Sequence, residues 1–151
     1  MWATNGGETL PFAFLQSKIK IKAMPQRNFK TIVIPLNTGT REYPLPTQAG
    51  MTGAKIVNLR TRRTGKTLLK QNLPSEAVFN AAMITLRDAT NNTDSVDSLP
   101  LYFIDQIGMA KGEGLSMTIG ELDFASSKII VQDENAIAPG TAIELTFEYI
   151  K

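Results

Sequence analysis

The chain has 151 residues, of which 42% are apolar and 20% charged, so one globular domain can form a substantial core. The sequence contains no Cys and no His. This excludes thiolate nucleophiles, metal sites built on Cys or His, and every catalytic triad that needs an imidazole base. An enzyme of this composition would depend on carboxylates, Lys, Tyr or a hard metal, so we expect no enzymatic activity and no cofactor.

The net charge of +2 hides an uneven distribution along the chain. Residues 1–73 hold twelve basic and two acidic side chains, whereas residues 74–151 hold four basic and twelve acidic ones. Such asymmetry suggests a basic surface for an acidic partner: nucleic acid, an anionic membrane face or the acidic patch of a neighbouring copy. If the two halves interleave in one sandwich, the charges mix in space and no bipolar surface forms.

Residues 1–28 are predicted to form an extended N-terminal arm. Within it, Lys18, Lys20 and Lys22 alternate with two Ile residues, which places three ammonium groups on one face of a strand and two Ile on the other. A lone strand of this kind cannot bury its Ile face. We therefore expect the arm to pair with the sheet edge of a neighbouring subunit, although it could instead fold back and close its own sandwich.

Residues 29–151 are predicted to form a β-sandwich domain, because a period of two dominates and no segment keeps a period of 3.6. The expected strands are 29–36, 41–45, 54–61, 67–71, 81–88, 99–105, 115–122, 127–132 and 141–150. A single helical turn is expected at 74–76. The fold class is therefore all-β, an antiparallel sandwich, with a jelly roll as the leading topology and an immunoglobulin-like sandwich as the second.

The alternation of apolar and polar residues also predicts which side chains form the core. The predicted core residues are Ile84, Leu86, Leu101, Phe103, Ile129, Val131, Leu145 and Phe147.

Arg60, Arg62 and Arg63 form the densest basic cluster in the sequence. Arg presents a planar fork that suits phosphate and carboxylate groups, so this cluster is a candidate anion clamp or subunit contact. No aromatic residue lies between Tyr43 and Phe79, so the stacking needed for nucleic-acid bases is missing. The alternative is a solvated hairpin without function.

The carboxylates suggest neither a catalytic nor a metal site. The spacing of an EF-hand calcium loop is absent. Glu144 and Glu148 share one face of the last expected strand, but four residues separate them by about 13 Å. That distance is too long for the carboxylate pair of a retaining glycosidase.

Two segments resemble structural proteins of bacteriophages: residues 81–105 (AAMITLRDATNNTDSVDSLPLYFID) and residues 139–147 (PGTAIELTF). The resemblance implies a single jelly-roll capsid protein of a tailless icosahedral phage, specifically the pentameric vertex (penton) protein. It further implies synthesis in the host cytoplasm and a final location in the virion. The implied partners are copies of this chain, as a pentamer or trimer, and a major capsid protein, with nonspecific contact to nucleic acid or membrane inside the shell and no small-molecule substrate.

On this hypothesis the basic groups serve assembly. The candidate residues for subunit or polyanion contact are Lys18, Lys20, Lys22, Arg60, Arg62 and Arg63. Three alternatives stay open: a capsid decoration or head-fibre subunit, a polyanion- or carbohydrate-binding β-module, and a carboxylate-based enzyme.

Overall fold

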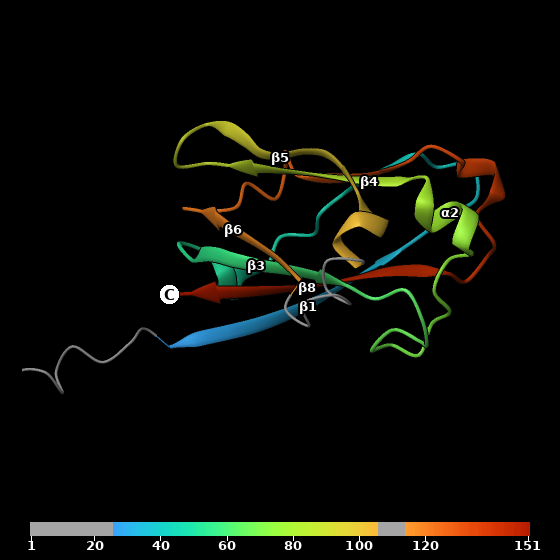
Figure 1. Ribbon diagram of the computed structural model, residues 1–151, viewed down its shortest axis with the longest axis horizontal. Coiled ribbons are helices and arrows are strands. Elements are labelled where there is room, and N and C mark those ends of the chain that lie inside the picture. The colour runs from blue at the N-terminus through green and yellow to red at the C-terminus, as the bar shows by residue number, and fades with distance from the viewer. Residues whose placement is uncertain (1–25, 106–113) are drawn as a thin grey trace, which may run out of the picture.

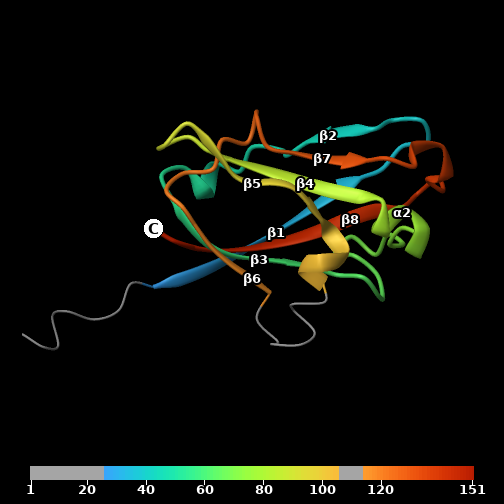
Figure 2. The same cartoon turned by 45° about the horizontal axis from the view of Figure 1, so that its top comes forward.

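The computed structural model describes residues 26–105 and 114–151. These residues form two antiparallel four-stranded sheets that pack face to face, which confirms the predicted all-β sandwich (Figures 1 and 2). Most of the predicted arm, including Lys18, Lys20 and Lys22, lies outside the described residues. Among the residues that are described, no helix has the length and apolar character needed to cross a membrane.

The first sheet has the strand order β1-β8-β3-β6 and the second has the order β2-β7-β4-β5. The strands are β1 (Arg27–Pro35), β2 (Glu42–Pro44), β3 (Lys55–Thr61), β4 (Ala82–Asp88), β5 (Thr93–Pro100), β6 (Leu115–Ile119), β7 (Lys128–Val131) and β8 (Ala142–Ile150). Helix α2 (Glu76–Asn80) and two short 3-10 helices, Ala49–Met51 and Glu134–Ala136, lie in the connections.

The strands pair in a nested pattern. The first strand pairs with the last, β1 with β8, and moving inward β2 pairs with β7, β3 with β6 and β4 with β5, always antiparallel. Two further antiparallel pairs, β3 with β8 and β4 with β7, join these into the two sheets. The chain therefore follows the path of one long hairpin, closed at the β4–β5 turn, whose two halves wrap together around the core.

The core lies between the inner faces of the two sheets, as the alternation predicts. Seven of the eight predicted core side chains are buried, namely Ile84, Leu86, Leu101, Ile129, Val131, Leu145 and Phe147. In β4 the burial alternates strictly, with Ala82, Ile84 and Leu86 inside. This regularity explains why the apolar and polar pattern alone located the strand.

The prediction for residues 99–105 was wrong. Strand β5 begins at Thr93 and ends at Pro100, and residues 101–105 are helical. A helix brings positions i and i+3 to one face, so Leu101 and Ile104 are buried while Phe103 is 45% exposed. The period-two pattern had placed Phe103 beside Leu101 in the core, because a short apolar run does not by itself distinguish a strand from a helical turn.

The predicted strand at 67–71 is also wrong, because these residues form a loop. The Thr67 N–H donates to the Gln71 carbonyl at 3.0 Å, and Lys70 has a φ of 61°, in the left-handed region that reverses the chain. The helical turn expected at 74–76 is present as α2. Ser75 caps this helix by accepting a hydrogen bond from the Val78 N–H.

Candidate functional site

Arg60, Arg62 and Arg63 lie together, as predicted, on the outer face of the first sheet and just beyond β3. They line a shallow pocket of about 350 Å³, to which Asp105 and Glu144 also contribute. Arg60 occupies an outward position of β3 opposite Thr146 of the neighbouring strand β8. The site is therefore built where β3, β8 and the loop that follows β3 meet.

Two acidic side chains of β8 complete this site. Glu144 and Glu148 point outward from the sheet, yet only 4% and 6% of their surface is exposed. Strand β8 lies between β1 and β3 in the sheet order, so long side chains from both neighbours can cover its outer face. A buried carboxylate needs charged or hydrogen-bonding partners, and the structure provides both.

Glu144 is held by a cation and by the main chain. The Arg62 Nε atom lies 3.1 Å from Glu144 Oε1, and the Leu68 N–H donates to Glu144 Oε2 at 2.7 Å. The same carboxylate therefore fixes Arg62 and the loop that carries Leu68 against the sheet.

Glu148 lies between two arginines from different strands. Arg27 Nη1 on β1 is 2.6 Å from Glu148 Oε2, and Arg60 Nη2 on β3 is 3.8 Å from Oε1. The Arg60 guanidinium also lies over the Phe29 ring, 5.6 Å from its centroid. The charged groups of three adjacent strands and of the loop after β3 thus form a cross-strand ladder, here called the Arg–Glu ladder: Arg27, Arg60, Arg62, Glu144 and Glu148.

Arg63 extends this network away from the sheet. Its Nη2 atom is 2.6 Å from Glu76 Oε1 on α2, and its Nη1 atom is 3.9 Å from Asp105 Oδ2. The guanidinium also lies over the Phe79 ring, 5.8 Å from the centroid. Arg63 therefore joins the end of β3 to α2 and to the helical residues 101–105.

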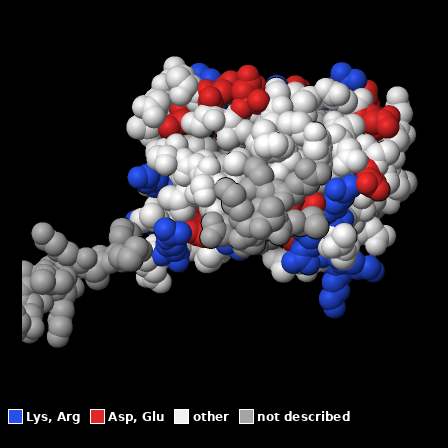
Figure 3. Space-filling model, in the orientation of Figure 1, with Lys and Arg blue, Asp and Glu red and all other residues white. Residues whose placement is uncertain are grey.

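These contacts change the interpretation of the charge asymmetry. Of the eight ion pairs among the described residues, seven join a residue of 1–73 to a residue of 74–151. The two halves interleave, and each arginine of the predicted cluster has an acidic partner within its own chain. A uniformly basic clamp is thus not present at this position, although Figure 3 still shows acidic groups mainly along the β4–β5 edge and basic groups along the opposite edge.

Sequence reasoning missed Glu144 and Glu148 as members of the arginine site. It recognised both as outward-facing residues and considered them only as a catalytic pair. A usable signal was present, because both carboxylates lie on outward positions of one strand, where cations on the adjacent strands pair with them favourably.

Another buried carboxylate, that of Asp88, was also missed. It is 1% exposed and accepts hydrogen bonds from the Thr90 N–H and the Asn91 amide, both at 2.9 Å, and from the Gly120 N–H at 3.3 Å. Burial by itself would raise the pKa of Asp88, but hydrogen bonds from Gly120, Thr90, Asn91 and Glu121 outweigh it, so the pKa lies below its ordinary value. Asp88 joins the β4–β5 turn to the loop after β6.

No protein-family model, curated protein or solved structure matches this chain. Within residues 26–105 and 114–151, no three His, Cys, Asp or Glu side chains gather in a way that could hold a metal ion. The chemistry of the described site is thus that of paired Arg and Glu groups, which suits holding strands and loops in a fixed arrangement.

Proposed function

We propose that this protein is a structural subunit of a viral capsid, that it acts by self-assembly, and that its sandwich is a jelly roll. The observation that carries the proposal is the nested pairing of eight strands into the sheets β1-β8-β3-β6 and β2-β7-β4-β5. A jelly roll is an eight-stranded double sheet of this wrapped kind, and viral capsid domains are among the proteins built on it.

The exposed apolar side chains give further support. Among the described residues, four large apolar side chains are strongly exposed: Phe29 at 57%, Leu68 at 66%, Leu69 at 69% and Phe103 at 45%. Leu68 and Leu69 are adjacent in the loop that Glu144 holds against the sheet. Adjacent exposed apolar side chains such as Leu68 and Leu69 suit contact with a partner, and a capsid subunit is surrounded by neighbours.

The resemblance of residues 81–105 and 139–147 to phage structural proteins favours a vertex protein within this class. A vertex of an icosahedral shell has fivefold symmetry, so a penton protein is expected as a closed ring of five copies. The decoration or head-fibre alternative predicts three copies instead.

The oligomer number tests the proposal. Molar mass is measured by light scattering on the full chain over a wide concentration range. The expected result is a species of five copies at high concentration, and a species of three copies would replace the penton assignment with the decoration alternative. A monomer at every concentration would contradict self-assembly, and a glycan or polyanion that then binds tightly would favour the binding-module alternative.

A further inference from the structure

One side of the sandwich is open between β5 and β6. In the described part of the chain, β5 pairs only with β4 and β6 pairs only with β3, so each strand is the edge of its sheet. Together they line a groove of about 450 Å³. The outer edge of each strand presents main-chain N–H and C=O groups that an added strand could pair with.

The groove has an apolar floor. Val96 and Leu99 of β5 and Leu115 and Met117 of β6 line it, and all four are partly buried and packed against the core. In β6, Leu115 and Met117 are separated by one exposed residue, so both point inward in the period-two pattern of a strand. The groove therefore suits a ligand with two apolar side chains at alternate positions.

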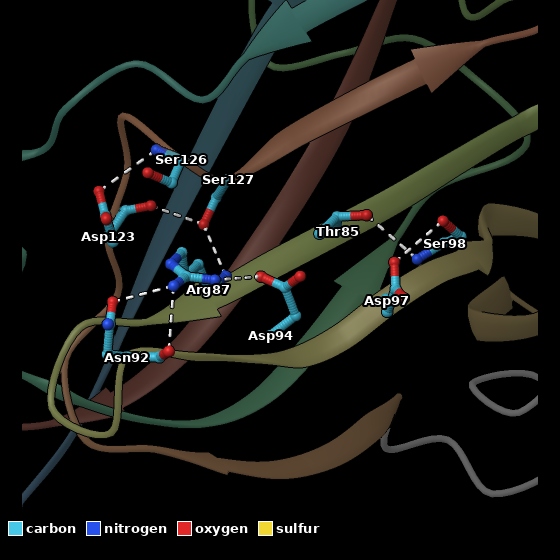
Figure 4. Close-up of polar contacts among 9 residues, drawn as sticks. All are labelled: Thr85, Arg87, Asn92, Asp94, Asp97, Ser98, Asp123, Ser126 and Ser127. Carbon is cyan, nitrogen blue, oxygen red and sulfur yellow. Dashed lines mark hydrogen bonds and ion pairs between the residues drawn. The ribbon is translucent and has the colours of Figure 1, made fainter.

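The rim of the groove on β5 carries one carboxylate, that of Asp97. Asp97 is exposed and lines the groove, and neither β5 nor β6 contains a basic residue. Asp94 pairs with Arg87 at 3.1 Å, whereas Asp97 accepts only a hydrogen bond from the Ser98 hydroxyl among the contacts of the described residues, as Figure 4 shows. The carboxylate of Asp97 is thus available to a cation at the mouth of the groove.

We propose that this groove receives residues 18–22 (KIKIK) of a neighbouring copy as an added strand. The inference rests on the proposed self-assembly and names the contact through which it occurs. Ile19 and Ile21 enter the groove and cover its apolar floor, while the three Lys side chains stay at the mouth beside β5. Main-chain hydrogen bonds to the open edge supply the rest of the binding.

Length, pattern and charge all support this fit. Residues 18–22 are five residues long, as is β6. Their Ile residues alternate as the groove requires, and their charge of +3 is opposite to that of the Asp97 carboxylate. The same carboxylate repels the Asp97 of a second β5 edge, so the rim favours a basic strand over edge-to-edge pairing of identical copies.

The reach of the arm indicates a neighbouring copy. Strands β1 and β6 are at opposite edges of the first sheet, so three strand spacings, about 14 Å, separate them along a line through the sheet. The five residues from Lys22 to Arg27 span at most about 17 Å when fully extended. A path around the outside of the sheet is longer than that line, so the linker has little slack to reach the groove of its own chain, and a neighbouring copy meets the groove without this constraint.

Site-specific disulfides test this inference directly, because the chain contains no Cys. The variants Ile21→Cys and Met117→Cys are purified separately, checked for an unchanged melting temperature, mixed and oxidised mildly. The expected product is a disulfide-linked dimer that contains one copy of each variant. Asn135→Cys is the control, because Asn135 is exposed outside the groove. Equal cross-linking of Ile21→Cys to Asn135→Cys would overturn the inference.

The contribution of the three Lys charges of residues 18–22 to binding is tested separately. Changing Lys18, Lys20 and Lys22 to Glu is expected to raise the dissociation constant of the oligomer about tenfold, and adding Asp97→Lys in the same chain should recover part of the loss.

If the double variant Ile21→Cys, Met117→Cys forms its disulfide within one chain, the arm occupies its own groove and the inference fails. If wild-type oligomers form but no cross-link appears, the groove is wrong and self-assembly stands. If the wild type never oligomerises, the proposed function fails as well.

Discussion

Asp88 is the most tightly held carboxylate among the described residues. Replacing it with Asn removes the charge and turns an NH₂ group toward main-chain N–H donors, so we expect a loss of about 1.5–3 kcal/mol in the free energy of unfolding at neutral pH. Because the pKa of Asp88 is lowered in the folded state, its contribution is present above the unfolded pKa of about 3.9 and is lost as the pH falls through the folded value.

Thermal unfolding followed by circular dichroism between pH 3 and pH 7 checks this prediction. The difference between wild type and Asp88→Asn should be largest at neutral pH and should shrink below about pH 4. Asp133→Asn, at an exposed position, is the control and should change the stability by less than about 0.5 kcal/mol. A difference that does not depend on pH would contradict the role given to the charge.

The Arg–Glu ladder offers a matched comparison between two ion pairs. The side chains of Arg27 and Arg41 are equally exposed, at 58%, but the partner carboxylate is 7% exposed in Glu148 and 22% exposed in Glu134. Arg27→Met leaves a buried carboxylate with Arg60 at 3.8 Å, so it is expected to cost about 1–2 kcal/mol. Arg41→Met should cost less than about 1 kcal/mol.

Urea unfolding of both variants measures this difference. Equal losses would show that burial of the acidic partner does not determine the strength of these pairs. A larger loss for Arg41→Met would reverse the argument.

At the scale of the secondary-structure element, β8 is an inner strand of the first sheet that pairs with both β1 and β3. Its inner face carries Leu145 and Phe147, which are fully buried, and its outer face carries the two glutamates of the ladder. One strand therefore supplies both the core and the acidic half of the site.

Phe147 and Phe103 form a second matched pair. Phe147→Ala removes a fully buried ring and should cost about 3–5 kcal/mol, whereas Phe103→Ala removes a ring that is 45% exposed and should cost less than about 1.5 kcal/mol. The midpoint of urea unfolding at an unchanged m-value measures both losses. Similar losses would mean that Phe103 belongs to the core, as the sequence pattern had predicted.

At the scale of the whole molecule, we expect that the arm can be removed without unfolding the sandwich. Strand β1 begins at Arg27, so deleting residues 1–26 leaves every strand of the two described sheets intact. We expect the truncated protein to keep its melting temperature and to lose the oligomer seen in light scattering. If the truncated protein unfolds instead, the arm is part of the core of its own sandwich.

The alternation of apolar and polar residues along the sequence predicted several strands and most of the core. The period of two located β1, β4 and β8 to within about two residues and identified seven of eight predicted core side chains, because alternation along a strand depends only on neighbours in the sequence. It failed at residues 101–105, where Leu101 and Ile104 have helical spacing and a five-residue run was too short for the period to be recognised.

Only the basic residues of the candidate site could be predicted from the sequence. Arg60, Arg62 and Arg63 are neighbours in the chain, so their proximity was visible without a structure. Their acidic partners were not, because cross-strand contacts depend on which strands pair and in which register. Arg27 and Glu148 are 121 positions apart, and only the nested pairing of β1 with β8 brings them together. Composition and alternation thus determined the fold class and the core, whereas tertiary pairing decided that the described arginines of the basic half pair with carboxylates of the acidic half.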